Sequence, residues 1–212
     1  MCTSCFSNAY NFLFSSFYDS FMYTIEKEIL REKRHSLLSE LKGDILEIGS
    51  GTGINFRYYP EEARVFALEP SRHMWKKATE RMEKESPVAK IHPIISGFFG
   101  DKLPEGLEEN SMDYIVSTLV LCTVPDPENS ILQFKKILKP KGKLIILEHI
   151  RSVDSFTAMI QDGLNPVWSI VSEGCNFNRP TDFLLKQYGF VPLIEEYFFH
   201  TLPFYSASLV MS

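Results

Sequence analysis

The stretch that decides the fold is Asp44-Ile45-Leu46-Glu47-Ile48-Gly49-Ser50-Gly51-Thr52-Gly53. Residues 44–48 are typical of a short buried strand, and three glycines follow at alternate positions. A glycine turn between a strand and a helix lets backbone N–H groups approach a ligand closely, and the helix dipole favours negative charge there. The stretch therefore predicts a nucleotide-type binding loop in an α/β fold.

The spacing of these glycines discriminates between cofactors. A dinucleotide-binding fingerprint, G-x-G-x-x-G/A, would place its third small residue at position 54, which is Ile54. The third glycine comes one place earlier, and Glu47 stands where it can meet the ammonium end of an amino-acid cofactor. The pattern favours S-adenosylmethionine (SAM) over NAD. We expect the loop to bind it through Glu47, Gly49, Ser50, Gly51, Thr52, Gly53 and Asn55.

Four further residues are candidates for the same cofactor site. Glu69 ends the next predicted strand, where a carboxylate can accept both hydroxyls of a ribose. Pro70 opens the following helix, and Met74 either packs on the adenine face or belongs to the apolar core side of that helix. In the turn at 97–104, Asp101 either reaches the adenine edge or is an ordinary exposed loop residue.

Strand and helix patterns alternate along the chain. Apolar runs predict strands at 44–48, 65–68, 91–95, 112–121 and 143–147, with helices at 54–59, 70–84 and 130–138 and a turn at 139–142. Strands separated by helix-length segments indicate a parallel sheet covered on both faces. The runs 191–199 and 205–211 predict a closing antiparallel pair.

The 212 residues fit a single domain in four parts. Residues 1–41 form an N-terminal helical cap, with a helix over 8–41 whose charged residues 26–28 and 31–34 supply a solvated face. Residues 42–150 form the cofactor-binding core. The less regular residues 151–185 are expected to form a lid or insertion, and 186–212 a C-terminal β-hairpin.

Composition narrows the classes of partner. A net charge of -5 leaves no electrostatic footprint for a phosphate backbone, so a nucleic-acid partner is not expected. The aromatic share of 13% suggests a pocket for an apolar ligand. Cys2 and Cys5 are followed by no second pair at ligand spacing, so we expect no metal site and free thiols in a reducing cytosol.

The apolar N-terminal stretch 6–25 predicts neither a signal peptide nor a membrane span. It has no basic region before the apolar run, and Asn, Ser and Asp interrupt it repeatedly. We therefore expect a cytoplasmic location. The N-terminal helix either caps the cofactor, packs as a plain helix, or rests peripherally on a membrane surface.

With these pieces placed, the chain resembles the class I SAM-dependent methyltransferases of the type 11 group over nearly its whole length. The match includes residues 113–116 and 138–143, where Lys141 replaces the first glycine of the usual Pro-Gly-Gly turn. Finer features resemble the alkyl-thiol methyltransferase branch and its small bacterial relatives. They are residues 53–60, 118–124 and 147–150, Pro166-x-Trp168, residues 174–176 with Arg179, and residues 203–205.

The resemblance implies a Rossmann-like sheet of seven strands, mostly parallel with one antiparallel strand, helices on both faces and an N-terminal helical cap. It also implies a cofactor at the carboxyl ends of strands one to four, with Tyr18 in the cap over its methionine end and Thr118 and Leu119 near the transferring methyl. His149 is the candidate general base or, alternatively, a structural partner beside Glu148. The acceptor pocket would be lined by Trp168, Phe177, Arg179, His200 and Tyr205, with Arg179 alternatively in a structural salt bridge.

These features favour SAM-dependent methylation of a small lipophilic thiol, quinol or amine, releasing S-adenosylhomocysteine. Residues 117–120 contain no Asn-Pro-Pro-Tyr-like motif, which disfavours methylation of amides or nucleobases. One alternative is a SAM-binding sensor or partner module without catalysis. Another is an NAD-dependent oxidoreductase, which Ile54 and the absence of a Tyr-x-x-x-Lys pair oppose.

Overall fold

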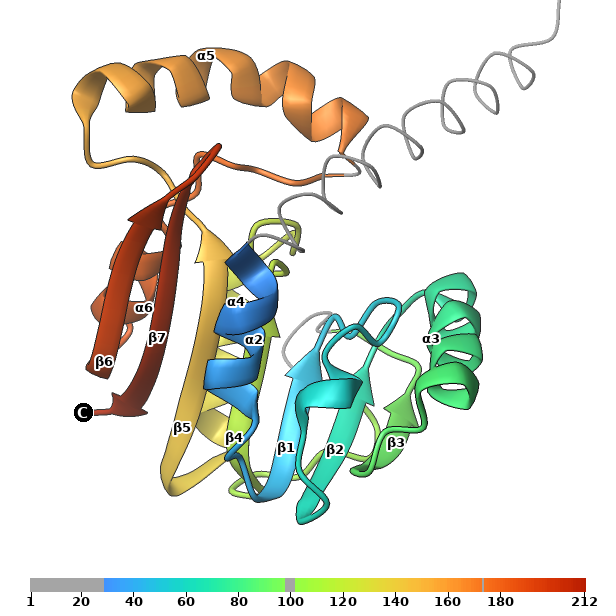
Figure 1. Cartoon of the computed structure of the whole chain (residues 1–212). Helices are drawn as coiled ribbons and strands as arrows, with labels where there is room; N and C mark the ends of the chain where they lie inside the picture. The colour runs from blue at the N-terminus through green and yellow to red at the C-terminus, as the bar shows by residue number, and fades with distance from the viewer. Residues whose placement is uncertain (1–28, 98–101, 173) are drawn as a thin grey trace, which may run out of the picture.

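A computed structural model of the chain describes residues 29–97, 102–172 and 174–212 (Figure 1). Several predictions fall outside these residues: the part of the predicted cap before residue 29, which includes Tyr18, the pair Cys2 and Cys5, and Asp101. In chain order the described elements are α2 (Arg31–Leu38), β1 (Gly43–Ile48), the 3-10 helix η2 (Phe56–Tyr58), β2 (Ala63–Leu68), α3 (Arg72–Glu85), β3 (Lys90–Ile94), β4 (Met112–Thr118), α4 (Pro127–Ile137), β5 (Leu138–His149), α5 (Ser155–Val171), α6 (Thr181–Gln187), β6 (Phe190–Phe199) and β7 (Pro203–Met211).

The strands form one seven-stranded sheet in the order β3-β2-β1-β4-β5-β7-β6. Strands β1 to β5 pair in parallel, and β7 runs antiparallel to both of its neighbours, β5 and β6. Within the described residues β7 is thus the one reversed strand. The predicted sheet, with its closing antiparallel pair, is confirmed.

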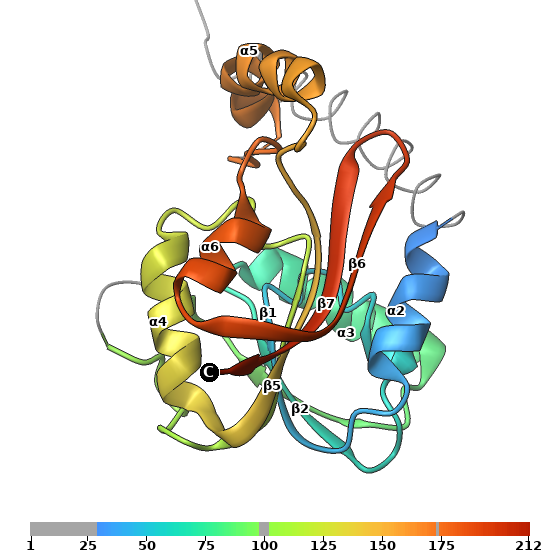
Figure 2. The ribbon, with the colours of Figure 1, turned by 90° about the vertical axis from the view of Figure 1, so that its left-hand side faces the viewer.

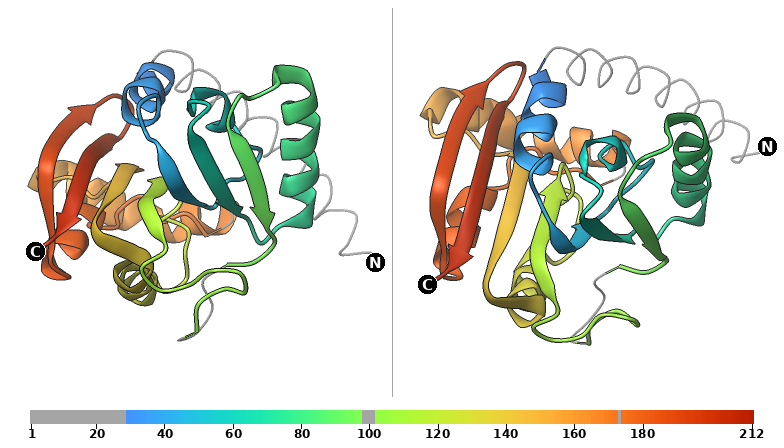
Figure 3. Two further views of the ribbon diagram at one scale, coloured as in Figure 1. Left: turned by 90° about the horizontal axis from the view of Figure 1, so that it is seen from below. Right: turned by 60° about the horizontal axis from the view of Figure 1, so that its bottom comes forward.

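Alternate side chains along the strands feed two separate cores. On β1, Leu46 and Ile48 join one core and Ile45 the other, as the pleat of a strand requires. The first core packs against α4 and α6, and the second against α2, η2 and α3. Figure 2 and the view from below in Figure 3 show α2 and α4 on opposite sides of the sheet, so helices cover both faces.

Two predicted elements are shorter or differently built. The helix expected at 54–59 is only the three-residue η2, because Tyr59 is already extended and Pro60 follows. The turn expected at 139–142 is absorbed into β5 as a bulge. Met112 pairs with Leu138 and Tyr114 with Lys143, and Lys141 takes a positive φ of 74° within the extra residues.

Residues 151–185 are more regular than the sequence indicates, and their assignment as a lid or insertion stays a prediction. They contain the 17-residue helix α5, with Pro166 inside it, and the short helix α6. Gly163 and Pro166 weaken the helical signal in the sequence, and the apolar side chains of α5 do not form a buried stripe. Instead, many of them are exposed, namely Phe156, Met159, Ile160, Leu164, Val167 and Ile170.

Parallel strands β1 to β5 end along the same edge of the sheet. Figure 1 shows α5 lying beyond this edge, at the top of the view. Gln161 on α5 donates to the backbone oxygens of Ile150 and Phe177, which fixes the helix to the end of β5. The chain segments that follow β1, β2, β4 and β5 therefore lie along one edge of the sheet, and α5 is fixed to that edge at the end of β5.

Candidate active site at the carboxyl edge of the sheet

The turn after β1 leaves open space at one glycine. Gly49, Gly51 and Gly53 all have positive φ, at 56°, 55° and 72°. A Cβ at Gly49 would lie 2.6 Å from Cγ1 of Val120, and one at Gly53 would lie 2.6 Å from Cε2 of Phe56. At Gly51 the nearest atom would be the Gly49 oxygen, at 3.8 Å. The middle glycine therefore faces space that a ligand can occupy.

Glu69 joins this turn to the end of β2. One carboxylate oxygen accepts a hydrogen bond from the Gly51 N–H at 2.9 Å, and the other accepts one from the Ser71 N–H at 2.8 Å. A carboxylate offers about four acceptor positions, so two remain. Glu69 therefore keeps the capacity to accept ribose hydroxyls that the sequence predicts for it.

Glu47 is engaged by the protein itself. Its carboxylate accepts hydrogen bonds from Asn55 Nδ2 at 3.0 Å and from the Tyr59 hydroxyl at 2.8 Å, and the side chain is buried. Burial raises the pKa of Glu47 to about 7, and the hydrogen bonds from Tyr59 and Asn55 oppose the shift. The predicted contact with a cofactor ammonium stays a prediction, whereas bracing of the segment from Asn55 to Tyr59 is observed.

Arg34 is a buried part of the same network. Its side chain donates to Asn55 Oδ1 at 2.6 Å and to Thr118 Oγ1 at 2.8 Å, and Asn55 Nδ2 also donates to Thr118 Oγ1 at 2.9 Å. The prediction that 31–34 is a solvated face is wrong for Arg34, which is 3% exposed. Leu30 and Leu38 stand four residues to either side and share its helix face, a spacing that points Arg34 at the sheet.

The chain after β4 adopts a strained conformation at the predicted methyl-transfer position. Leu119 has a φ of 59°, which is uncommon for a residue with a side chain. The buried carboxylate of Glu148 stabilises it, accepting from Ser117 Oγ at 2.6 Å and from the N–H groups of Val120 and Leu121 at 3.0 and 3.1 Å. Burial raises the pKa of Glu148. Its role is to fix the loop that carries Leu119.

His149 lies beside two cysteines. Its Nε2 atom is 3.1 Å from Sγ of Cys175, and the candidate ligand atoms of His149, Cys122 and Cys175 all lie within 4.8 Å of one another. Their exposed fractions are 8%, 2% and 5%. A hydrogen bond from Cys122 lowers the pKa of Cys175 to about 4 against the effect of burial, and His149 adds to the lowering. The same hydrogen bond, together with burial, raises the pKa of Cys122.

The link between α5 and α6 closes over this cluster. Asn176 donates to the Cys122 oxygen from its backbone N at 2.9 Å and from Nδ2 at 3.3 Å. Arg179 donates to the backbone oxygens of Leu121 and Val124. Arg179 therefore supports the loop after β4 through two carbonyl groups, which differs from the alternative of a structural salt bridge.

The predicted pocket residues divide into two groups. Trp168 and Phe177 pack edge to face, with ring centroids 5.6 Å apart, close to the cysteine cluster. Tyr205 instead lies in the core, where its hydroxyl donates to Glu195 at 2.9 Å and its ring stands 4.9 Å from that of Tyr197. Burial raises the pKa of Tyr205.

Two more aromatic side chains lie at or near the β6–β7 turn. His200, another predicted pocket residue, lies in that turn and is half-buried. Phe204, which sequence reasoning missed, has its ring 6.5 Å from that of His149. Its place opposite His149 in the β5–β7 register could not be known before the pairing of these strands.

Helix α3 begins at Arg72 with Ser71 as its N-cap, so Pro70 precedes the helix that the sequence predicts it to open, and Met74 lies in the first turn. Both are exposed, Met74 at 36%, and Met74 N–H donates to Ser71 Oγ at 3.3 Å to cap the helix. This exposure disfavours the core-packing alternative for Met74. It leaves the side chain accessible to a ligand at the turn after β1.

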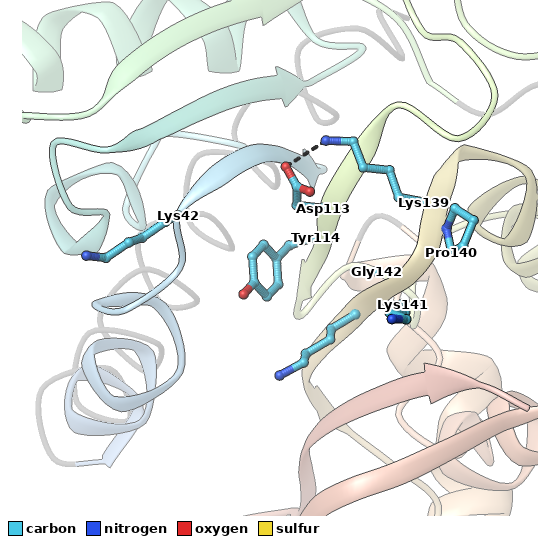
Figure 4. A pocket seen from close by; sticks show the side chains of 8 residues that line it. Lys42, Asp113, Tyr114, Lys139, Pro140, Lys141 and Gly142 are labelled. Carbon is cyan, nitrogen blue, oxygen red and sulfur yellow. Dashed lines mark hydrogen bonds and ion pairs between the residues drawn. The ribbon is translucent and has the colours of Figure 1, made fainter.

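A hollow of about 230 Å³ lies at the opposite, amino-terminal edge of the sheet. It is lined by Lys42, Asp113, Tyr114 and residues 139–143 (Figure 4). Lys139 is already paired with Asp113, at 2.8 Å. The hollow is separated by the length of the strands from the glycine turn and the cysteine cluster, so it is not part of the candidate site.

Comparison with known proteins agrees with this geometry. A family model described as a methyltransferase domain matches residues 18–194. The human thiol S-methyltransferase TMT1B is 32% identical over 161 residues, and human TMT1A is 27% identical over 178 residues, or 80% of this chain and 72% of that protein. A SAM-dependent methyltransferase from Aquifex aeolicus superposes with a TM-score of 0.56 at 15% identity, covering 87% of this chain and 89% of its own.

The match to TMT1B covers 72% of this chain and 65% of the human protein, which is less than two thirds of that relative. None of the helices in the described ranges combines the length and the apolar character needed to cross a bilayer.

Proposed function

The chain belongs to the methyltransferase domain family, and from this premise we propose that it uses SAM to methylate a small lipophilic acceptor, preferably a thiol. The observation that carries the proposal is the open space at Gly51 beside the carboxylate of Glu69. Quinols and amines are the other acceptor classes that the sequence allows. The relatives named thiol S-methyltransferases support the choice of a thiol.

The residues present fit SAM. The turn 49–53 offers backbone N–H groups next to open space, Glu69 retains free acceptor positions, and Met74 is accessible at the same edge. Ser50 Oγ is buried without a hydrogen-bond partner among the described residues, and a bound cofactor would supply one. When bound, SAM supplies a methyl group on a positively charged sulfur.

The residues on the acceptor side suit a lipophilic molecule. The ring of Phe204 lies against that of His149, and Trp168 and Phe177 form a second aromatic pair. Helix α5 carries exposed apolar side chains beyond the same edge. A thiol is already a few per cent thiolate at neutral pH, so the chain has mainly to orient it and exclude water. Because Nε2 of His149 contacts Cys175, we propose that His149 acts on the acceptor together with the cysteines rather than as an isolated base.

We further propose a cytoplasmic protein that contacts membranes peripherally through its N-terminal helix and binds no nucleic acid. The net charge of -5 supports the absence of a nucleic-acid partner. The exposed apolar side chains of α5 would add a second contact with a membrane surface, beside that of the N-terminal helix. Flotation with vesicles of neutral phospholipid tests the membrane contact. A chain that stays at the bottom of the gradient argues against it.

Binding and turnover separate the candidate functions. Calorimetry with SAM, S-adenosylhomocysteine and NAD should show binding of the first two and none of NAD. A panel of alkanethiols, quinols and amines should then give S-adenosylhomocysteine release, fastest with an alkanethiol. Binding of NAD without SAM would overturn the proposal, whereas SAM binding without product from any acceptor would favour a non-catalytic module.

A further inference from the structure

Three residues that commonly bind metals converge in the interior from three separate segments. Cys122 follows β4, His149 ends β5 and Cys175 lies between α5 and α6. Their Sγ, Nε2 and Sγ atoms lie within 4.8 Å of one another, and each side chain is more than nine-tenths buried. Buried polar groups normally have hydrogen-bond partners or ligands, so the meeting of three such side chains in the interior calls for an explanation.

The ligand types and their number define a class of ion. Two thiolates and one imidazole are a recognised set for Zn²⁺, and a site with three protein ligands keeps a fourth position open. The described residues supply no fourth His, Cys, Asp or Glu to the group. From this geometry we propose that Cys122, His149 and Cys175 bind a zinc-type divalent cation whose open position receives the sulfur of the acceptor. The second half of this proposal rests on the proposed function.

The distances are compatible with such an ion after a small adjustment. Tetrahedral coordination at ordinary Zn–S and Zn–N lengths separates a sulfur from a nitrogen ligand by about 3.5 Å. Sγ of Cys175 and Nε2 of His149 are 3.1 Å apart, so the pair has only to open by a few tenths of an ångström.

Hydrogen bonds around the cluster join two of the three segments, those of Cys122 and Cys175. Asn176, the residue after Cys175, donates two hydrogen bonds to the Cys122 carbonyl. Arg179 supports the carbonyls of Leu121 and Val124 on either side of Cys122. Groups outside the coordination sphere usually hold the ligands in place. Ligands that are fixed in this way lose little conformational entropy when an ion binds.

The position of the cluster gives the ion a use in the reaction. It stands at the ends of β4 and β5, next to the loop of Leu119. An acceptor R–SH that coordinates there gives its proton to solvent and stays as R–S⁻. The thiolate then forms the new S–C bond to the methyl carbon as the bond from that carbon to the sulfonium breaks, giving R–S–CH₃ and S-adenosylhomocysteine.

The metal is tested on the full chain, reduced with a phosphine and titrated with Co²⁺ as a spectroscopic substitute for Zn²⁺. We expect one ion per chain, tetrahedral Co²⁺ bands and thiolate-to-metal charge transfer, all displaced by Zn²⁺. The C2S/C5S variant removes the other two of the four cysteines and should keep these signals. C122S and C175S, with folding checked by circular dichroism, should each weaken Co²⁺ binding at least tenfold.

Absence of charge transfer in the folded, reduced wild-type chain would overturn the site, and this measurement depends on no variant. So would a signal that disappears in C2S/C5S and persists in C175S, or a disulfide between Cys122 and Cys175 that forms with Zn²⁺ present in excess. Each of these outcomes would leave the three side chains as a hydrogen-bonded or redox-linked group without an ion.

Binding of the acceptor sulfur to the ion is tested separately. Adding an alkanethiol to the Co²⁺-loaded chain without SAM should intensify and shift the charge-transfer band, and chelation should slow S-adenosylhomocysteine release at least tenfold. An unchanged spectrum, or full turnover by the chelated chain, would overturn this half while the Co²⁺ titration still supports the site. Failure of the proposed function is distinguishable, because it would abolish turnover with every acceptor and in every metal state.

Discussion

The side chain of Arg34 donates a 2.8 Å hydrogen bond to Thr118, and this contact joins α2 to the end of β4. Because Arg34 also donates to Asn55, the first described helix, the segment after the glycine turn and the predicted methyl-transfer position share one buried network. Displacement of α2 would leave polar groups of Asn55 and Thr118 without this donor. The network therefore links the position of α2 to the shape of the cofactor side of the site.

Replacing Arg34 by Met should lower both stability and SAM affinity. The variant keeps most of the apolar stem and removes the donor to Asn55 and Thr118. Thr118 Oγ1 keeps the hydrogen bond from Asn55 Nδ2, whereas Asn55 Oδ1 loses this donor, and an unsatisfied buried acceptor costs about 1–3 kcal/mol. We expect the free energy of unfolding to fall by about 1–3 kcal/mol in urea titrations. Arg31→Met, on the exposed side of the same helix, is the control and should change it by less than about 0.5 kcal/mol. Equal effects of the two variants would contradict a structural role for Arg34.

Glu47 should make stability depend on pH between about 4.5 and 7. Its pKa in the folded chain is raised to about 7 from 4.5. Its contribution is therefore fully present below pH 4.5 and is lost as the pH rises to 7. Glu47→Gln removes the titration. The free energy of unfolding of the variant minus that of the wild type should therefore increase across this pH range, by up to about 3 kcal/mol. Urea titrations at pH 5, 6, 7 and 8 measure the difference, and a difference that is independent of pH would refute the raised pKa.

How much of this site could be foreseen depends on how far apart its parts lie in the chain. Glu47, the glycine turn and Glu69 were identified because strand ends followed by loops leave a local pattern. Arg34 was misassigned because its neighbours 31–33 are charged, although its spacing from Leu30 and Leu38 carried the opposite signal.

The cysteine cluster left no local pattern at all. Cys122 and Cys175 are distant in sequence, and their proximity arises only when the α5–α6 link folds back over β4. The sequence therefore directed attention to Cys2 and Cys5, whose spacing resembles half of a metal site, and away from the pair that the fold assembles. The exposed apolar side chains of α5 were equally hidden, because periodicity alone cannot tell an exposed apolar position from a buried one.

Replacing Gly51 by Ala should impair SAM binding, whereas the same change at a matched glycine outside the site should affect stability alone. Its φ of 55° disfavours a side chain, but the added Cβ would meet only the Gly49 oxygen, at 3.8 Å. Gly106 provides a matched control, with a φ of 88° and nothing within 4 Å. Both variants should lose about 1 kcal/mol of stability from the left-handed backbone.

Only the Gly51 variant should lose SAM affinity, by about tenfold or more, which corresponds to 1.4 kcal/mol. Calorimetry on the two variants measures both affinities under one set of conditions. Unchanged affinity in Gly51→Ala would show that the open space beside Glu69 is not where the cofactor binds.

Replacing Arg179 by Met should separate the acceptor side of the site from the cofactor side. Arg179 supports the backbone of Leu121 and Val124, which belong to the loop after β4 and not to the glycine turn after β1. Without it the loop that carries Cys122 should loosen. We expect kcat/KM for an alkanethiol to fall about tenfold, the equivalent of 1.4 kcal/mol, while the Kd for SAM stays within about twofold.

Arg151→Met is the matched control for this variant. Arg151 pairs with Asp162 at 2.8 Å on the exposed side of α5, where an ion pair contributes about 0–1 kcal/mol, so both constants should remain near their wild-type values. A parallel loss of SAM affinity in Arg179→Met would mean that the loop after β4 serves the cofactor as much as the acceptor. Equal losses of kcat/KM in the two variants would mean instead that any loosening of the α5 region is enough, and that support of the Cys122 loop by Arg179 has no separate role.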